Sequence, residues 1–118
     1  MQTRPLRSVL TSSEHASSQK YRLFFLPAAL EEWSRLDGSV REPLKKLLAK
    51  RLDQPHVPGG RLHGTLSTCY KIKLRKQGVR LVYTVQEARL IVLVLAVDRR
   101  EDSAAYQSAL ARLQSIVN

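Results

Sequence analysis

One stretch in the middle of the sequence carries basic side chains without acidic ones, and such side chains could bind and polarise a phosphate group. No acidic residue occurs between Asp53 and Glu87, whereas six lysines and arginines fall in that interval. Clustering of one charge costs self-repulsion unless an anionic partner offsets it, so the pattern favours RNA, DNA, an anionic membrane or an acidic protein over an ordinary solvated surface. The six basic residues are Arg61, Lys71, Lys73, Arg75, Lys76 and Arg80.

The spacing of these residues predicts that several share one face of a β-sheet. Over residues 70–75, apolar and basic residues alternate with the two-residue period of a strand. After a short turn signal, the alternation resumes over residues 79–85, so the two segments are expected to pair as a hairpin. That pairing brings Arg80 to the same face as Lys71 and Lys73.

Other kinds of catalytic site find little support in the sequence. Cys69 is the only cysteine, and His15, His56 and His63 are scattered without the spacing of metal ligands. The chain has no phosphate-cradling glycine loop, no nucleophile elbow and no pair of carboxylates that spacing supports. We therefore expect neither a metal nor another cofactor.

Length and composition predict one small globular domain. The chain has 118 residues, of which 43% are hydrophobic and 25% charged, and its formal net charge is +10. A lone cysteine suits a reducing compartment, and no segment has the apolar length of a signal-peptide core or a membrane span, so we expect a cytoplasmic protein without membrane contact. Residues 1–20 are polar and lack periodicity, so we expect a disordered N-terminal tail there and the domain at residues 21–118.

The first half of the domain predicts a strand followed by a helical hairpin. Residues 21–26 are rich in aromatics and are followed by Pro27, which suits a strand and then a helix with proline at its first position. A second helix is expected to begin at a capping box formed by Ser39 and Glu42, with Pro43 in its first turn. The two helices should pack as an antiparallel pair.

The second half predicts a three-stranded antiparallel meander and a C-terminal helix. Residues 90–97 are apolar throughout, as in a central strand that is covered on both faces. An amphipathic stripe from Tyr106 to Val117 predicts the last helix. The expected fold class is α+β, with an N-terminal strand, a helical hairpin, a three-stranded antiparallel meander and a C-terminal helix.

Three stretches of the chain carry a specific family likeness. Cys-Tyr-Lys-Ile-Lys-Leu-Arg at 69–75 is the densest, Gly-Val-Arg-Leu-Val-Tyr at 78–83 continues it, and Arg-Arg-Glu and Ser-Ala-Ala-Tyr resume it within 99–106. In order, spacing and residue type they resemble the RelE family of toxins, and the likeness extends from Tyr21 to about Leu113. The resemblance implies a RelE-like microbial ribonuclease fold and a metal-independent endoribonuclease, or mRNA interferase, of a type II toxin–antitoxin system.

The family's reaction implies roles for five residues. It is a ribosome-dependent cut of messenger RNA in the A site, in which a ribose 2′-hydroxyl attacks the adjacent phosphate and leaves a 2′,3′-cyclic phosphate and a free 5′-hydroxyl. By this resemblance Tyr106 or Lys73 would accept the hydroxyl proton, and Arg100 would serve the leaving group. Lys71 and Arg80 would hold the phosphate. Further candidates for RNA contact are Arg61, Arg75 and Lys76.

The resemblance also implies partners, and two rival functions stay open. The expected partners are a RelB-like antitoxin with an acidic C-terminal segment, the ribosome with its rRNA, and messenger RNA, while DNA would be bound only through the antitoxin complex. One rival is a ParE-type inhibitor of DNA gyrase, which shares the architecture but lacks the catalytic basic set. The other is a non-catalytic module that binds nucleic acid or antitoxin.

Overall fold

Five strands form one mixed sheet in the part of the chain that the structure describes. The structure, a computed structural model, describes residues 4–5, 20–99 and 102–117. The strand order across the sheet is β1-β2-β5-β4-β3. The strands are β1 (Arg4–Pro5), β2 (Arg22–Phe25), β3 (Cys69–Leu74), β4 (Val79–Gln86) and β5 (Ile91–Asp98), and the helices are α2 (Pro27–Ser34), α3 (Gly38–Asp53) and α4 (Asp102–Val117).

The predicted antiparallel meander is present as β3, β4 and β5. Strand β4 pairs with β3 on one side and with β5 on the other, both antiparallel, and the pairing with β5 shifts register between Val82 and Tyr83. Strand β2 adds to the far side of β5 in parallel, which the sequence pattern did not indicate. The sheet is therefore mixed, with β5 at its centre, and this central place explains why β5 is buried almost throughout.

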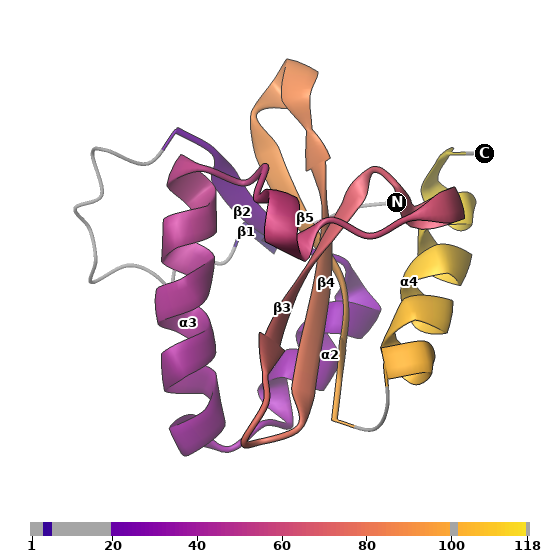
Figure 1. The fold of residues 1–118 in the computed structure, drawn as a ribbon. Helices are drawn as coiled ribbons and strands as arrows, with labels where there is room; N and C mark the ends of the chain where they lie inside the picture. The colour runs from indigo at the N-terminus through magenta and orange to yellow at the C-terminus, as the bar shows by residue number, and fades with distance from the viewer. Residues whose placement is uncertain (1–3, 6–19, 100–101, 118) are drawn as a thin grey trace.

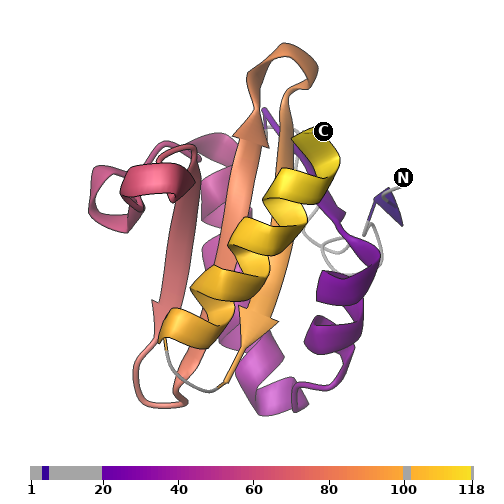
Figure 2. The same cartoon turned by 90° about the vertical axis from the view of Figure 1, so that its right-hand side faces the viewer.

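Helices cover both faces of the sheet. Helix α3 packs on one face and α4 on the opposite face, where it begins beside the β3–β4 turn and crosses β4 and β5 diagonally (Figures 1 and 2). Helix α2 packs against β5 and β2, whereas α3 contacts β3. The two expected helices are thus present in sequence order, and each rests on a different part of the sheet.

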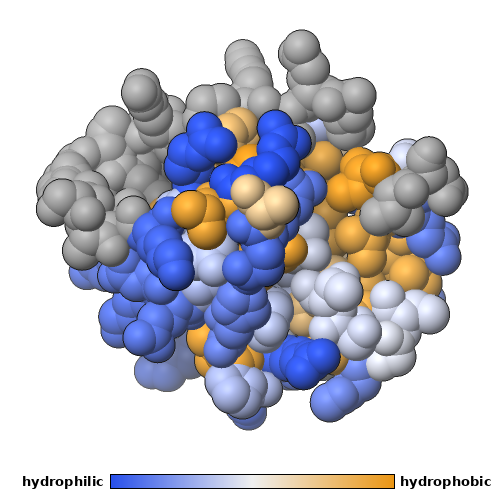
Figure 3. Space-filling view, turned by 90° about the horizontal axis from the view of Figure 1, so that it is seen from above, coloured by the Kyte–Doolittle hydropathy of each residue, from blue (hydrophilic) through white to orange (hydrophobic). Residues whose placement is uncertain are grey.

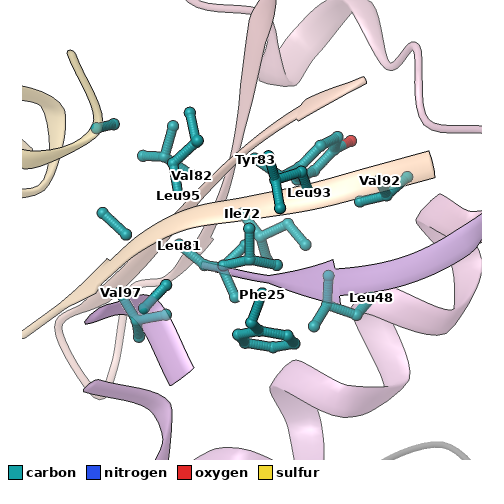
Figure 4. Close-up of a cluster of buried hydrophobic side chains, with 14 of the residues drawn as sticks. Phe25, Leu48, Ile72, Leu81, Val82, Tyr83, Val92, Leu93, Leu95 and Val97 are labelled. Atoms are coloured by element: carbon teal, nitrogen blue, oxygen red, sulfur yellow. The ribbon is translucent and has the colours of Figure 1, made fainter. Parts of the chain in front are cut away.

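A layer of buried apolar side chains lies between α3 and the sheet. Leu48 of α3 lies beside Phe25, Ile72 and Leu81 (Figure 4), and each of the four is at most 2% exposed. Complete burial of a side chain of this size stabilises the fold by about 1.5–3 kcal/mol. Burial in this layer therefore contributes substantially to the stability of the fold.

Two local expectations from the sequence are wrong. Helix α3 begins at Gly38, so Asp37 rather than Ser39 occupies the N-cap position, and no side chain caps it there. Pro43 consequently lies inside the helix, where it has no N–H to donate to the preceding turn. Leu90 does not begin the last strand but stands before it in a left-handed conformation with φ of 54°, 39% exposed, because the chain must reverse direction between β4 and β5.

The expected N-terminal tail lies largely outside the described residues. Within it the structure describes Arg4–Pro5, which pair as β1 with Phe24 and Phe25 of β2. The assignment of residues 1–20 to a disordered tail stays a prediction. None of the helices in the described ranges is long and apolar enough to cross a membrane.

A partly buried ion pair joins α2, β5 and α4. Strand β2 pairs with β5 only as far as Val94, so the next residues of β5 need other partners on that edge. The Glu32 carboxylate accepts the backbone N–H of Val97 (3.0 Å), and Arg112 donates to the carbonyl oxygen of Leu95 (2.8 Å). Arg112 also donates to both oxygens of Glu32, at 2.9 Å each. These bonds raise the pKa of the Arg112 guanidinium, although its burial alone would lower it.

Removal of the Glu32 carboxylate should be costly for stability. We expect Glu32→Ala to lower the free energy of unfolding by about 1–3 kcal/mol, because Arg112 loses its ion pair and the Val97 N–H loses its acceptor in a region only about a quarter exposed. Chemical denaturation of both proteins measures the difference. The matched control is Glu31→Ala at the neighbouring position, whose exposed ion pair with Arg35 should contribute no more than about 0.5 kcal/mol. Equal losses for the two variants would contradict the structural role given to Glu32.

Candidate nucleic-acid interface

Strand register places three of the predicted site residues on one face. Lys71 lies opposite Val82, and Lys73 lies opposite Arg80. Directly opposed residues in an antiparallel pair point to the same side of the sheet, so Lys71, Lys73 and Arg80 share the face of Val82. Figure 4 shows Val82 and Leu95 on the side toward α4, away from Leu48 and Phe25. The cations therefore lie on the α4 face.

One row across this face combines two cations and a carboxylate. Arg80 of β4 lies opposite both Lys73 of β3 and Asp98 of β5. Like charges that face each other across strands are destabilising, and Asp98 offsets part of that repulsion. A guanidinium N–H of Arg80 also donates to the carbonyl oxygen of Gly78 (3.1 Å), which directs the side chain toward the β3–β4 turn. Asp98 was not singled out in the sequence, because only the register between β4 and β5 brings it opposite Arg80.

Tyr106 comes to the same face because α4 folds back over the sheet. Tyr106 lies in the second turn of α4. The N-terminal end of this helix lies beside the β3–β4 turn (Figure 2). Its ring packs against the apolar core and its hydroxyl oxygen is buried. Arg100, the other residue that was expected to join the site from this region, lies outside the described residues.

The three lower-ranked basic residues do not gather in one place. Arg75 and Lys76 are exposed in the turn between β3 and β4, next to the row of Lys73 and Arg80. Arg61 lies at the other end of β3, where it bridges to Tyr70 and donates to the carbonyl oxygen of Ser67 (3.1 Å). Tyr70, the bridge partner of Arg61, and Arg75 are five residue steps apart along the strand, a distance of about 16 Å. A bound polyanion would have to run along β3 to contact both.

A buried network that sequence reasoning missed holds the backbone at Lys71. Arg51 of α3 donates to the Lys71 carbonyl oxygen (3.3 Å) and to the Tyr83 hydroxyl (2.8 Å), which in turn donates to the Pro55 carbonyl oxygen (2.7 Å). Burial raises the pKa of Tyr83, and Arg51 offsets part of that rise. Gly60 packs so closely that a β-carbon there would stand 2.9 Å from the Lys71 oxygen. No pattern in the sequence signals these contacts.

His56 takes part in a separate cluster near the start of β2. Its imidazole pairs with the Glu87 carboxylate, which also accepts a hydrogen bond from the Tyr21 hydroxyl (3.0 Å), and its ring meets that of Tyr70 edge-on. Desolvation, together with Glu87, raises the pKa of Tyr21. These contacts tie the loop after α3 to the turn between β4 and β5. Among the described residues, no three histidine, cysteine or carboxylate side chains gather closely enough to hold a metal ion.

The surface at the β4–β5 turn differs from the cationic face. Viewed from above, this end of the molecule shows mainly hydrophilic side chains over its centre and apolar surface toward the side where α4 lies (Figure 3). The apolar side chains of α4 that stay partly exposed include Leu110, Leu113 and Ile116. Strand register places the row of Lys73 and Arg80 at the other end of the sheet, beside the β3–β4 turn.

The arrangement of cations can bind and polarise a phosphodiester. Lys71, Lys73 and Arg80 supply positive charge on one face, and α4, which carries Tyr106 with a buried hydroxyl, packs on the same face. Because none of these four residues is a histidine, general acid–base catalysis by them would fall to lysine, arginine or tyrosine side chains. Fixed cations of this kind stabilise charge that develops on phosphate oxygens.

Comparison with known proteins relates this fold and face to a family of toxins. A family model described as the ParE toxin of the type II toxin–antitoxin system parDE matches residues 23–104. The mRNA interferase toxin RelE of Escherichia coli K12 is 44% identical over 93 residues, covering 79% of this chain and 97% of that protein. The mRNA interferase RelE of Shigella flexneri matches with the same identity and coverage.

Solved structures agree with the sequence relatives. An arginine-to-alanine double mutant of E. coli RelE in the free state matches with a TM-score of 0.72 and 41% identity, covering 80% of this chain and 98% of that one. RelE in the intact E. coli RelBE toxin–antitoxin complex matches with a TM-score of 0.66 and 44% identity, covering 69% and 98%. The fold and its cationic face thus define a toxin of the RelE/ParE superfamily. Within that superfamily the chain belongs to the RelE family, and the predicted α+β class is confirmed.

Cys69 should be chemically inert in the folded protein. It is fully buried, and burial raises the pKa of its thiol, with hydrogen bonds from Thr68 and Thr84 offsetting part of the rise. We expect the native protein to react with a disulfide reagent such as DTNB at least about 100-fold more slowly than the protein in 6 M guanidinium, because reaction requires opening of the fold. The control is a Cys69→Ala, Ser67→Cys variant, whose exposed thiol should react at similar rates in both conditions. Rapid labelling of native Cys69 would contradict the burial.

Proposed function

We propose that this chain is the toxin of a type II toxin–antitoxin system and cleaves messenger RNA in the ribosomal A site. Membership of the RelE family and relatives named mRNA interferase support the activity. The structural observation that carries the proposal is the convergence of Lys71, Lys73 and Arg80 on the face to which α4 brings Tyr106. The enzyme works without a metal or another cofactor, in the cytoplasm.

The reaction is a transesterification followed by release of the downstream fragment. The ribose 2′-oxygen loses its proton to Tyr106 or Lys73 and bonds to the adjacent phosphorus, while the bond from phosphorus to the 5′-oxygen breaks. The 5′-oxygen takes a proton from Arg100, which leaves a 2′,3′-cyclic phosphate and a 5′-hydroxyl. Lys71 and Arg80 hold the phosphate oxygens as negative charge accumulates. A tyrosine or lysine, with a reference pKa of about 10, serves as a base near neutral pH only where neighbouring cations favour proton loss.

The ribosome supplies the orientation that the small protein lacks. The cationic face is open along β3 and provides charge more than a fitted cavity, so a free RNA would bind in many poses. Holding the 2′-oxygen in line with the scissile bond accelerates such reactions strongly, and the decoding site would fix the message in that way. Arg61, Arg75 and Lys76 would contact the RNA on either side of the cut.

The partner that inhibits the toxin is a RelB-like antitoxin. Structures of relatives contain E. coli RelE with RelB and with a RelB-derived peptide. An acidic antitoxin segment would cover the same cationic face that RNA needs, since both partners carry negative charge. DNA contact occurs only through the antitoxin in that complex.

Gyrase inhibition is the competing function, because the matching family model is named for ParE. Expression in cells distinguishes these two functions. If the chain is an mRNA interferase, its inducible expression should arrest growth and yield primer-extension stops within the codons of a translated message. Purified ribosomes with bound message should yield the same stops, and the message without ribosomes should not. Growth arrest with DNA damage and no cuts would establish the ParE-type function instead, and no arrest would indicate a non-catalytic module.

Substitution of the site residues tests their roles. We expect Lys73→Ala, Arg80→Ala and Tyr106→Phe each to reduce cutting by about 100-fold or more, because each removes a proton acceptor or a charge at the phosphate. Antitoxin binding should stay largely intact in Tyr106→Phe, which removes no charge from the face that the acidic antitoxin segment would cover. The matched control is Lys46→Ala, which removes one exposed cation from α3 on the opposite side of the sheet and should cut normally. Normal cutting by the site variants would show that the residue roles are wrong.

Salt dependence separates phosphate binding from catalysis. In a plot of the logarithm of affinity for single-stranded RNA against the logarithm of salt concentration, Lys73→Ala should make the slope shallower by about 0.7, because one fewer counterion is released. Tyr106→Phe should leave the slope unchanged, since it removes no charge. Fluorescence anisotropy with a labelled oligonucleotide measures both. Identical slopes for wild type and Lys73→Ala would mean that Lys73 makes no phosphate contact.

A further inference from the structure

The fully buried part of the contact between α4 and the sheet is formed by small side chains. Ala105 and Ala109 are the α4 residues that are fully buried among those described, whereas the larger apolar residues of the helix are only partly buried. Alanine side chains bury little area and make few interlocking contacts. They let α4 approach β4 and β5 closely but do little to determine its rotation about its own axis.

The Glu32–Arg112 ion pair supplies a directional contact that the alanines lack. Arg112 makes two parallel hydrogen bonds to the carboxylate and a third to the Leu95 carbonyl oxygen, with both charged side chains about a quarter exposed. Such bidentate pairs constrain orientation as well as distance. The carboxylate is itself held by the Val97 N–H of β5. Arg112 is therefore anchored to the sheet rather than to a freely rotating side chain.

Helical geometry connects this anchor with Tyr106. At 3.6 residues per turn, Arg112 and Tyr106 project about 120° apart, on opposite flanks of the line through Ala105 and Ala109. With Arg112 held at the open edge of β5, the other flank of α4 must face across β4 toward β3. That is the side on which Lys71, Lys73 and Arg80 lie.

We propose that Glu32 and Arg112 are positioning residues for RNA cleavage: their ion pair sets the rotation of α4 and thereby the place of the Tyr106 hydroxyl over the cationic face. This inference rests on the proposed function. Neither residue touches the RNA, and each acts through Tyr106. Substitution at this pair should lower both stability and activity. We expect the loss of activity to be larger than the loss of stability alone would cause.

The test compares Arg112→Lys with wild type in cleavage of ribosome-bound message, well below both melting temperatures. Lysine keeps the charge but not the two parallel bonds. We expect kcat to fall about tenfold to a hundredfold, as for a catalytic group displaced by a fraction of an ångström to one ångström, and KM for the ribosome to change less than twofold. In a spectrum of ring-¹³C tyrosine, the Tyr106 resonance should move while those of Tyr21 and Tyr70 stay in place.

Two controls distinguish positioning from general destabilisation. Leu48→Val weakens the core on the opposite face of the sheet, and at the same margin below its melting temperature it should keep wild-type kcat. In the Tyr106→Phe background, Arg112→Lys should cause no further loss of kcat, because the group through which it acts is already absent.

The outcomes separate the two proposals. A wild-type chain that does not cut overturns the proposed function, and this inference with it. If wild type cuts and Arg112→Lys cuts with the same kcat, only the positioning role is overturned. The same holds if Leu48→Val loses as much activity as Arg112→Lys, or if the effects of Arg112→Lys and Tyr106→Phe are fully additive.

Discussion

The two faces of the sheet are covered unequally, and the rest of the structure depends on this inequality. On one face α3 and the strands form a dense apolar layer around Leu48, Phe25 and Leu81. On the other face α4 packs against β4 and β5, while the outward side chains of β3 include Lys71 and Lys73. Burial of apolar surface on the first face stabilises a fold whose second face is left available for charge.

Two arginines from helices donate hydrogen bonds to backbone carbonyl groups of the sheet. Arg51 from α3 donates to the Lys71 carbonyl oxygen, and Arg112 from α4 donates to that of Leu95. An unpaired carbonyl in a partly buried position would cost stability, and a charged donor satisfies it strongly. Because both contacts lie directly behind or beside the cationic face, the interactions that complete the fold also constrain the candidate site.

The cationic face contains an arrangement of charges that is unfavourable for the stability of the sheet. Lys73 and Arg80 oppose each other across two strands, an arrangement that weakens a sheet, and Asp98 provides one balancing charge nearby. Natural proteins usually accept such conflicts where function requires them. A bound anion would add negative charge beside these two cations and so reduce their mutual repulsion.

Local patterns in the sequence were sufficient for the α+β class, the antiparallel meander and the shared face of Lys71, Lys73 and Arg80, because two-residue alternation and a short turn determine which side chains point together. They were insufficient for the start of α3, the conformation of Leu90 and the parallel pairing of β2 with β5, which depend on how distant segments meet. Tertiary structure alone decided that Asp98 opposes Arg80, that Arg51 supports Lys71 and that Glu32 binds Arg112. These pairs are separated by 18 to 80 residues, and no local period relates positions so far apart.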